Sequence, residues 1–388
     1  MTVFVPGNRV DLLRTGDEYF PALEAAIAAA RREVRVETYI FEDDPTGRRI
    51  AQALADAARR GVAVRVLVDG FGAANLVASI REILEPAGVR VLVYRPEGER
   101  FRFRRHRLRR LHRKLVVVDG RVGFCGGINL IDDRDGRGEG APRFDFAVRV
   151  AGPIVADMQL AVRRLWALVE WSRSGRIRAG FVRPEPPPEA FADGRRAAFV
   201  ARDSLRSRRG IEDAYLDAIR GARSEILIAN AYFLPGRRFR RALRDASERG
   251  VRVRLLLQGV PDHLLVHYAT RALYGSLIDA GIEIHEYVRA HLHAKVAVVD
   301  GRWATVGSSN IDPFSLLLSR EANVVVDDAA FADALRQSLE RAIHAESVTI
   351  VHETWSRQPW TLRVASWLAF QSARVLRGLT GFGRDDEL

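Results

Sequence analysis

The spacing of apolar residues along the chain predicts helices and strands in alternation. Residues 26–41 and residues 218–233 each carry apolar positions at helical spacing and then a run rich in β-branched residues. A change from a period of about 3.6 residues to a period of about two marks the end of a helix and the start of a strand. At residues 60–68 and 249–257 a glycine ends another predicted helix and a strand follows. Strands that alternate with helices favour an α/β fold with largely parallel sheets.

These segments form an internal repeat. The matching pairs are residues 26–41 with 218–233, 60–68 with 249–257, 87–91 with 280–284, and 111–120 with 292–301. The last pair reads LHRKLVVVDG and LHAKVAVVDG, so each half ends on a strand that carries a shared motif. We predict two repeated α/β halves with mixed, largely parallel sheets, related by a pseudo-two-fold axis, with the active site at their interface.

The repeat and the composition between its copies divide the chain into parts. The first domain is expected at residues 1–180 and the second at residues 201–352. Residues 181–200 contain a cluster of prolines among charged residues, which is typical of a linker. Residues 353–388 form an amphipathic C-terminal tail. The halves differ most at residues 95–111, a basic insert before the first motif that the second half lacks.

Composition and charge narrow the class of partner. Hydrophobic residues make up 47% of the chain and charged residues 28%, which indicates a globular protein. The formal net charge of +12 favours polyanionic partners, namely nucleic acid, anionic lipid or small phosphates, although a general solubility surplus also explains it. The single cysteine, Cys125, excludes an intramolecular disulfide and a cysteine-based metal cluster, and its apolar neighbours predict a buried structural thiol.

Lysine is almost absent from the chain. Of 61 lysines and arginines only Lys114 and Lys295 are lysines, and each stands two residues after a histidine. Lysine is a compact point charge, whereas arginine is a broad planar fork. Genome composition can explain arginine elsewhere, but lysine at these two positions indicates a site that tolerates only the compact cation.

Both lysines belong to a motif that occurs twice with identical spacing, H-x-K-x4-D-x6-G-[GS]-x-N. Its members are His112, Lys114, Asp119, Gly126, Gly127 and Asn129 at residues 112–129, and His293, Lys295, Asp300, Gly307, Ser308 and Asn310 at residues 293–310. Residues i and i+2 of a strand share a face, so each histidine projects together with its lysine. The Asp-Gly steps predict tight turns, after which a second strand returns the small residues and the asparagine to the histidine.

A meeting of the two copies would assemble two histidines, two lysines and two asparagines. Cations and amide donors stabilise the negative oxygens of a phosphodiester, while imidazoles attack phosphorus and transfer protons. Two lysines neutralise the phosphate charge without a metal, so we expect neither a metal nor a cofactor. Asp119 and Asp300 stand at the turns, where we expect structural positions even though they belong to the motif.

Other histidines have spacings that also occur in metal sites. His291 and His293 form an H-x-H pair, and His263 and His267 are four residues apart. Neither pair has a matching third set of ligands. We therefore expect His291, His263 and His267 in the pocket wall or in structural positions. His267 and its neighbour Tyr268 are candidate substrate contacts.

The double motif resembles the phospholipase D superfamily, and the resemblance covers nearly the whole chain. Residues 7–13, 37–41, 144–153 and 307–313 resemble a narrower group, the bacterial cardiolipin synthases of the type that lacks N-terminal transmembrane helices. The resemblance implies a ping-pong reaction through a phosphohistidine. It assigns catalysis to the motif residues His112, Lys114, Asp119, His293, Lys295 and Asp300, with His112 as the nucleophile and His293 as the acid and base.

The resemblance also implies a carboxylate downstream of each histidine that orients its imidazole. Asp145 follows His112 by 33 residues, and Glu321 follows His293 by 28. Both stand at the start of strand-like runs, and a surface carboxylate is the alternative for either. The remaining candidates to bind phosphate or orient the site are Asn129, Asn310, Gly127 and Ser308.

For the substrate, the resemblance implies transfer of a phosphatidyl group between phospholipids to form cardiolipin. The basic insert carries Phe101 and Phe103 among its arginines, which suits an anionic bilayer surface. The tail from Trp360 fits an interfacial helix and an ordinary packed terminal helix equally well. No run reaches the roughly 18 apolar residues of a membrane span, and no signal peptide is recognisable. We expect a peripheral protein on the cytoplasmic side of the cell membrane, with anionic phospholipids and the membrane surface as partners.

Two other functional classes stay open. A hydrolase or nuclease of the same superfamily is the main alternative, since Phe101 and Phe103 could stack on bases, although nucleic acid is the less expected partner. A non-catalytic lipid-binding protein is the second, and intact motifs in both halves argue against it. The sequence indicates no protein partner, and it leaves open the donor and acceptor lipids, transfer against hydrolysis, and the oligomeric state.

Overall fold

The computed structural model describes residues 2–73, 79–96, 110–134, 140–174, 185–202, 209–312, 319–356 and 359–379. Most of the basic insert, at residues 97–109, lies outside the described residues. The same holds for residues 181–184 of the expected linker and for residues 380–388 of the tail.

The elements follow one another in the same order in both halves. The first half contains β1 (Val5–Arg14), α1 (Thr15–Ala29), β2 (Glu33–Thr38), α2 (Pro45–Arg59), β3 (Ala63–Asp69), α3 (Ser79–Leu84), β4 (Arg90–Tyr94), β5 (Lys114–Val118), β6 (Val122–Gly126), β7 (Phe146–Ala151) and α4 (Val155–Ser174). The second half contains β8 (Arg195–Arg202), α5 (Gly210–Gly221), β9 (Glu225–Asn230), α6 (Arg237–Glu248), β10 (Arg252–Gln258), α7 (Leu264–Arg271), α8 (Tyr274–Ile278), β11 (Glu283–Tyr287), β12 (Lys295–Val299), β13 (Trp303–Gly307), β14 (Glu321–Asp327) and α10 (Ala329–Glu346). After it come β15 (Ser347–Ile350), α11 (His352–Ser356) and α12 (Trp360–Leu379).

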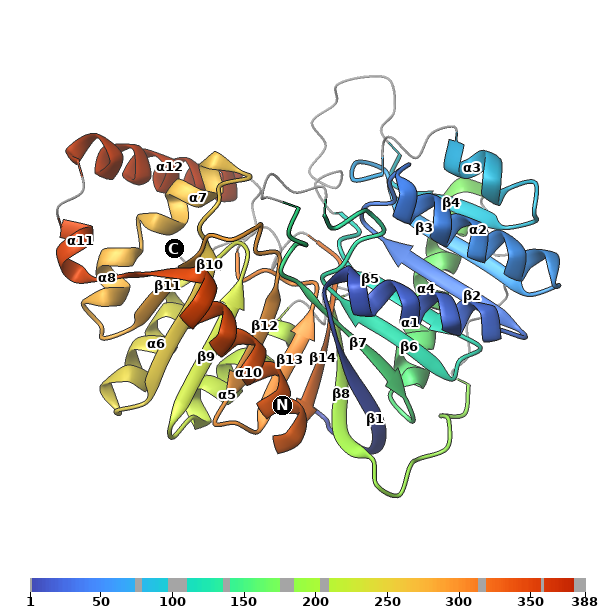
Figure 1. Ribbon diagram of the computed structural model, residues 1–388, viewed down its shortest axis with the longest axis horizontal. Helices are drawn as coiled ribbons and strands as arrows, with labels where there is room; N and C mark the ends of the chain where they lie inside the picture. The colour runs from blue at the N-terminus through green and yellow to red at the C-terminus, as the bar shows by residue number, and fades with distance from the viewer. Residues whose placement is uncertain are drawn as a thin grey trace.

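The described strands form one 15-stranded sheet, in the order β15-β11-β10-β9-β12-β13-β14-β8-β1-β7-β6-β5-β2-β3-β4. Apart from β15, the order is symmetric about the antiparallel pair of β1 and β8 at the centre. Corresponding elements of the repeat therefore occupy corresponding places on the two sides of the molecule (Figure 1). The predicted pair of repeated α/β halves is confirmed, and the two halves share a single continuous sheet.

The sheet is mixed, as predicted, but less of it is parallel than expected. Parallel pairing is confined to β2-β3-β4 and to β9-β10-β11. The motif strands β5 and β12 are antiparallel to both of their neighbours. The physical reason is the tight turn after each motif strand, because a chain that reverses within two residues can form only an antiparallel pair.

The central strand of the second half lies inside the segment expected to be a linker. β8 begins at Arg195, so the described part of the connection ends there and not at residue 200. Ala197 and Ala198 are buried, and the strand pairs with β14 along its length. The sequence gives a weak signal for this strand because small residues provide its buried face.

Helices cover both faces of the sheet. In the first half α1, α2 and α3 pack on one face and α4 packs on the other. In the second half α5 and α6 pack on one face and α10 packs on the other (Figure 1). One hydrophobic core extends through both halves, from Met158 of α4 to Leu335 of α10. Cys125 lies buried in this core, as predicted.

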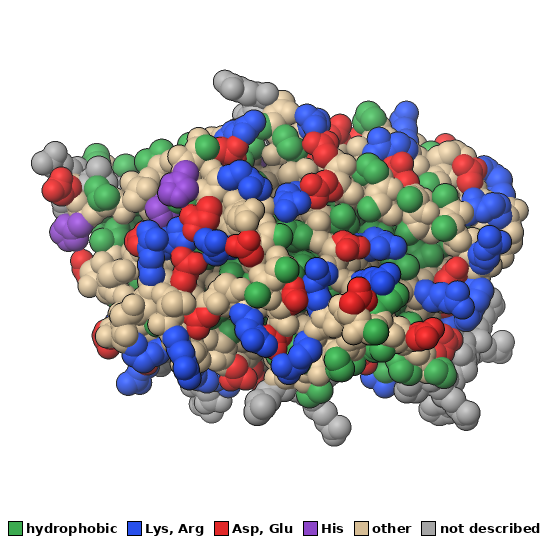
Figure 2. All heavy atoms as spheres, turned by 60° about the horizontal axis from the view of Figure 1, so that its bottom comes forward, with side chains coloured by type: hydrophobic (Ala, Val, Ile, Leu, Met, Phe, Trp, Pro, Cys, Tyr) green, Lys and Arg blue, Asp and Glu red, His purple; other side chains and the backbone are tan. Residues whose placement is uncertain are grey.

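Acidic side chains accompany many of the arginines on the surface of the protein (Figure 2). On the face in Figure 2, basic and acidic side chains are interspersed. Many arginines have acidic neighbours, and Arg254 contacts both Glu225 and Glu340. Interspersed charges of both signs favour solubility without selecting a polyanion. A binding surface for a polyanion must therefore be sought where arginines gather without carboxylates.

The Asp-Gly steps form the predicted tight turns between β5 and β6 and between β12 and β13. Asp119 and Asp300 adopt left-handed backbone conformations, with φ of 54° and 51°. Both oxygens of Asp119 accept hydrogen bonds from the backbone N–H groups of residues 31–33, at 2.7–2.9 Å. Asp300 binds the N–H groups of residues 223–225 in the same way. Both carboxylates therefore hold the backbone at the start of β2 and β9, and their assignment to the catalytic set stays a prediction.

Replacing Asp119 with asparagine should lower the free energy of unfolding by about 1–3 kcal/mol, because the amide has one acceptor oxygen and no charge. Asparagine tolerates the left-handed backbone, so the substitution isolates the hydrogen bonds. Burial raises the pKa of Asp119, but the three amide donors outweigh it and hold the pKa below its usual value. A carboxylate with a lowered pKa stabilises the folded protein only while it is ionised. The difference in unfolding free energy between wild type and Asp119→Asn should therefore shrink as the pH falls below about 4.

Urea unfolding of Asp119→Asn and wild type from pH 7 to pH 3 measures this effect. The control is Asp193→Asn, because Asp193 is a highly exposed carboxylate. Equal unfolding free energies for Asp119→Asn and wild type at pH 7 would show that the turn does not depend on the carboxylate.

Candidate active site

The two motif strands hold equivalent places in the symmetric sheet. His112 lies just before β5, which begins at Lys114. His293 lies at the equivalent position just before β12, which begins at Lys295. The backbone N–H of His112 donates to the carbonyl of Arg320 at 3.0 Å, and that of His293 donates to the carbonyl of Phe144 at 2.9 Å. Each motif is therefore hydrogen-bonded to the opposite half.

A cavity of about 460 Å³ opens where the two motifs meet. Its wall contains both histidines and both asparagines of the motifs, His112, Asn129, His293 and Asn310. Tyr39, Ile40 and Arg143 complete the first-half wall. The second half adds polar residues, which include Tyr232, Gln258, Asp262, His263 and His291. It also adds the apolar residues Leu234, Leu265, Val266, Ala269, Leu292 and Ala373. The motifs meet at the interface of the halves, as predicted. The lysines, Gly127, Ser308 and the two carboxylates lie behind this wall.

Each histidine is held by a carboxylate of the opposite half. Nδ1 of His112 lies 3.0 Å from Oε1 and 3.2 Å from Oε2 of Glu321. Nδ1 of His293 lies 2.5 Å from Oδ2 of Asp145. The partners expected from chain order, Asp145 for His112 and Glu321 for His293, are thus exchanged. The exchange follows from the backbone bonds between the halves, which place the residue before each carboxylate beside the other half's histidine.

A carboxylate on Nδ1 fixes the orientation of the ring. With Nδ1–H donated to the carboxylate, Nε2 is the ring nitrogen left for chemistry in the cavity. The same contact stabilises the imidazolium form during proton transfer. Both histidines therefore have the arrangement that a nucleophile or a general acid and base requires.

The side chains of Glu321 and Asp145 differ in length. The motif residue next to each carboxylate differs in size to match. Glu321 is one methylene longer than Asp145, and the hydroxyl of Ser308 donates to its Oε2 at 2.6 Å. At the equivalent place Gly127 has no side chain, and a Cβ there would lie 2.2 Å from Oδ1 of Asp145. Glycine is therefore required beside aspartate, while serine fits beside glutamate. Gly127 and Ser308 orient the carboxylates, and neither lines the cavity.

The two lysines lie behind the histidines in fully buried positions. The ammonium of Lys114 donates to the backbone carbonyl of His112 at 2.7 Å, and that of Lys295 donates to the carbonyl of His293. Burial lowers the pKa of Lys114 to about 7, and repulsion from Lys295 adds to the effect. Burial also lowers the pKa of Lys295, to about 8. A bound anion would reverse these shifts, because it favours the charged ammonium.

The same buried environment shifts the pKa values of His293 and of its carboxylate partner, Asp145. Burial, and then the charges of Lys295 and Lys114, hold the pKa of His293 well below its usual value. Burial raises the pKa of Asp145 to about 6, against the lowering effect of Lys295. Opposed shifts of neighbouring groups are typical of catalytic sites.

Asn129 presents its amide to the cavity from a fixed position. Its Oδ1 accepts a hydrogen bond from the backbone N–H of Ile40 at 3.2 Å. With the oxygen engaged in this way, the amide N–H2 group is the end available to a ligand. Asn310 occupies the equivalent place in the second half and is also buried in the cavity wall. Asn129 can therefore donate to a phosphoryl oxygen, whereas Oδ1 of Asn310 is buried with no hydrogen-bond partner within the described residues.

Several cavity residues were missed by reasoning from the motif. The centre of the Tyr39 ring lies 5.0 Å from that of the His112 ring. Nζ of Lys114 lies 5.3 Å from the centre of the Tyr39 ring. Arg143 adds a cation to the wall two residues before Asp145. The hydroxyl of Tyr232 donates to Asp262. Of these residues only Tyr39 could have been found from the sequence, because it lies within residues 37–41, which resemble the cardiolipin synthases. No spacing rule points to the others.

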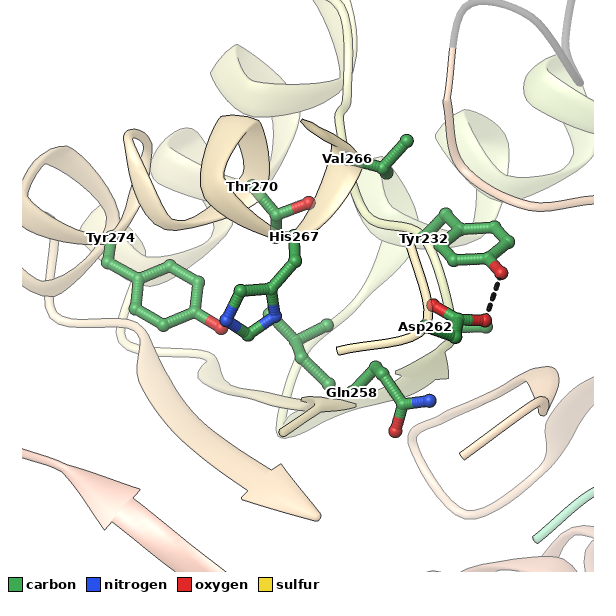
Figure 3. Close-up of a pocket in the computed structure, with 9 residues that line it drawn as sticks. Tyr232, Gln258, Asp262, Val266, His267, Thr270 and Tyr274 are labelled. Atoms are coloured by element: carbon green, nitrogen blue, oxygen red, sulfur yellow. Dashed lines mark hydrogen bonds between the residues drawn. The ribbon is translucent and has the colours of Figure 1, made fainter. Parts of the chain in front are cut away.

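Of the histidines with metal-like spacing, His267 lies outside the wall of the catalytic cavity. His291 and His263 belong to the cavity wall, and Nδ1 of His291 lies 3.2 Å from Nε2 of Gln258. His267 faces a small adjoining chamber that Gln258 and Tyr274 also line, as Figure 3 shows. Tyr268 packs against the core of the second half. Within the described ranges, no group of three or more His, Cys, Asp and Glu side chains has the arrangement of a metal site.

Known proteins resemble the chain in sequence and in fold. Residues 23–134 and 215–343 match the family described as cardiolipin synthase, phospholipase D-like domain. Cardiolipin synthase B of Escherichia coli (strain K12) is 39% identical over 386 residues, which cover 97% of this chain and 90% of the relative. A cardiolipin synthase of Geobacillus kaustophilus is 31% identical over 367 residues, covering 92% of this chain and 70% of the relative.

Among solved structures, phosphatidylserine synthase of Haemophilus influenzae Rd KW20 has the same fold. The TM-score is 0.70, with 97% of this chain and 96% of that chain covered at 13% sequence identity. The likeness extends over both halves and includes the way they are joined.

Substitutions at Gly127 and Asp145 test whether the size of the motif residue must match the length of the neighbouring carboxylate side chain. Gly127→Ser should reduce turnover about 100-fold, because the new side chain displaces the Asp145 carboxylate from His293. The double variant Gly127→Ser/Asp145→Glu recreates the second-half arrangement and should recover most of the lost activity. Steady-state kinetics with a phosphodiester substrate measures both. If the double variant is no more active than Gly127→Ser in a sample with an unchanged melting temperature, no such match is required.

Proposed function

The chain belongs to the cardiolipin synthase family of phospholipase D-like enzymes and is a phosphatidyltransferase, and we propose that it joins two phospholipids into cardiolipin through a phosphohistidine intermediate. The observation that carries the proposal is the pair of histidines on one cavity, each held at Nδ1 by a carboxylate of the opposite half. One such histidine can attack phosphorus while the other handles the proton.

In the first step Nε2 of His112 attacks the phosphorus of a donor phospholipid. A bond forms between Nε2 and phosphorus while the bond from phosphorus to the headgroup oxygen breaks. Protonated His293 donates its proton to that oxygen, so the headgroup leaves as an alcohol and the phosphatidyl group stays on His112. The choice of His112 as the nucleophile follows the resemblance to the superfamily.

In the second step the hydroxyl of an acceptor lipid replaces the departed headgroup. His293 takes the hydroxyl proton, the oxygen bonds to phosphorus, and the bond between phosphorus and Nε2 breaks. His112 returns to its neutral form and His293 is again protonated, so the cycle is closed. With a lipid such as phosphatidylglycerol as the acceptor, the product is cardiolipin.

The electrostatics of the empty site suit this cycle. Lys295 and Lys114 contribute to the low pKa of His293, and the negative charge of a phosphodiester opposes that contribution. Binding of the substrate therefore favours the protonated His293 that the first step needs. The lysines and the amides of Asn129 and Asn310 stabilise the charge that develops on the phosphoryl oxygens.

The wall of the cavity supports a lipid in preference to a nucleic acid. On the second-half side it contains the apolar residues Leu234, Leu265, Val266, Ala269, Leu292 and Ala373. Such a wall fits glycerol esters and the first carbons of acyl chains, and it limits access of water to the phosphohistidine.

Anionic phospholipids are the proposed partners, and the cytoplasmic surface of the membrane is the proposed place of work. The net charge of +12 suits a surface of anionic lipid. Among the helices of the described ranges, none is long and apolar enough to cross a bilayer.

Lipid mass spectrometry of purified protein incubated with phosphatidylglycerol, alone and with phosphatidylethanolamine, tests the reaction. Cardiolipin should form, and His112→Ala and His293→Ala should each lower its formation by at least about 1,000-fold. The control is His344→Ala, since that side chain is 78% exposed on α10. Absence of cardiolipin with both lipid mixtures, together with cleavage of single-stranded DNA, would favour a nuclease instead.

The pH dependence of kcat/KM follows from the shifted groups of the free enzyme. Activity should fall with rising pH as His293, whose pKa lies well below its usual value, loses the proton that the first step needs. It should also fall as Lys114 and Lys295 lose their protons with pKa values of about 7 and about 8. Because bound phosphate raises the lysine pKa values, the basic limb of kcat should lie at higher pH than that of kcat/KM. Coincident basic limbs would contradict the role given to the lysines.

A further inference from the structure

The last described helix, α12, exposes large apolar side chains and buries small ones. Its buried positions are Ser366, Ala369 and Ala373, which are at most 8% exposed, and of its larger side chains the half-buried Phe370 also packs against the core. Trp367 and Leu368 point outward and are 57% and 53% exposed. A terminal helix that served only to complete the core would bury its large side chains and expose the small ones. This reversed arrangement indicates that the outer face of α12 meets another apolar medium.

The apolar surface continues from α12 onto α7. The two helices pack along each other, and α12 runs beside α7 toward the middle of the molecule (Figure 1). The exposed apolar residues, here called the apolar platform, are Leu264, Leu265, Leu362, Val364, Trp367, Leu368 and Val375, each between 39% and 62% exposed. Exposed apolar surface that spans two helices is uncommon on soluble proteins unless it binds something.

A group of arginines lies next to the platform. Arg237, Arg240 and Arg244 are spaced on one face of α6, and Arg374 of α12 joins them, because all three other guanidinium groups act on the charge of Arg240. Burial and these like charges lower the pKa of Arg240, and no carboxylate is among the groups that act on it. Its buried Nε also has no hydrogen-bond partner. Guanidinium groups that gather in this way attract an anion, because a negative charge relieves their mutual repulsion.

The platform borders the mouth of the catalytic cavity. Leu265 belongs both to the platform and to the cavity wall, and Ala373 on the inner face of α12 also lines the cavity. Val266 and Ala269 of α7 extend the same wall inward. An apolar path therefore leads from the outer surface of α7 and α12 to the histidines. A lipid whose acyl chains follow this path can place its phosphate between the two motifs.

We propose that α6, α7 and α12 form a docking surface for an anionic phospholipid bilayer. The apolar platform enters the acyl-chain boundary of the bilayer, and the arginines bind the phosphate groups of neighbouring anionic headgroups. This inference rests on the proposed function for the identity of the lipid substrate, but binding of a bilayer is separable from catalysis. Of the two interpretations of the tail, it selects the interfacial helix and adds α6 as the source of charge.

Vesicle sedimentation with the full chain tests the docking surface. Trp367→Ser/Leu368→Ser should weaken binding to phosphatidylglycerol vesicles by at least about ten-fold, because both side chains then prefer water. The matched control is Leu168→Ser/Trp171→Ser on α4, which removes a tryptophan and a leucine of similar exposure, 51% and 46%. Equal binding of the two double variants would overturn the proposal.

The charged part of the surface has its own test. Arg240→Gln/Arg244→Gln should weaken binding to phosphatidylglycerol vesicles about ten-fold and reduce its dependence on salt, with no change on phosphatidylcholine vesicles. Arg336→Gln/Arg341→Gln of α10 removes the same charge elsewhere and should have little effect. An equal loss for both pairs would show that only net charge matters, and the arginine site would be rejected.

A labelled variant keeps the test independent of changes in folding. Because the single native cysteine is buried, Trp367→Cys can be labelled selectively with a polarity-sensitive fluorophore. Its emission should shift to the blue with phosphatidylglycerol vesicles, while a label at Trp171→Cys should not respond. No shift at position 367 in a protein that sediments with the vesicles would place the contact elsewhere.

Turnover separates this inference from the proposed function. With a short-chain, water-soluble phosphatidylglycerol the platform and arginine variants should retain wild-type kcat/KM, since none of the replaced residues touches the reacting atoms. Wild-type protein that binds vesicles but forms no cardiolipin would refute the proposed function and leave the docking surface in place. Loss of short-chain turnover in the platform variants would instead assign those residues to the site itself and refute the docking role.

Discussion

The carboxylate of Glu321, at the start of β14, holds Nδ1 of His112 from the other half, and Asp145 holds His293 in return. This exchange of partners is the contact on which the rest of the site depends. Neither half contains a complete histidine and carboxylate pair, so the site exists only while both halves keep their relative position. The continuous sheet through β1 and β8 and the core from α4 to α10 supply that constraint.

The buried charges explain why the site suits a phosphodiester. Two lysines lie behind the cavity, and the carboxylates that act on them most strongly, Glu321 and Asp145, are already engaged with histidine nitrogens. Burial lowers the pKa of both lysines and of His293 in the empty site, and the lysine charges add to the effect on His293. A phosphodiester brings the missing negative charge, and the stabilisation increases as charge builds up on its oxygens. The site is thus organised before the substrate arrives.

The sequence predicted what depends on short distances along the chain. The motif spacing correctly indicated a strand, a tight turn at Asp119 and a returning strand, and the repeat indicated two halves with an interface between them. It could not indicate that Asp145 serves His293, because the register between the halves is set by contacts over more than a hundred residues. β8 escaped notice for a related reason, since Ala197 and Ala198 are buried by neighbouring strands and carry little apolar signal themselves.

The repeat preserves the motifs but not their surroundings, and this difference separates the roles of the two histidines. In the mechanism proposed, His293 exchanges protons with headgroups that arrive and leave, while His112 keeps the phosphatidyl group. The apolar wall and α12 belong to the second half alone, so a lipid that enters from the bilayer passes beside His293. Asp145 beside glycine and Glu321 beside serine then hold two imidazoles of similar exposure through carboxylate side chains of different length. Duplication would by itself give two equivalent histidines, and in the docking that we propose the one-sided lipid path makes them unequal.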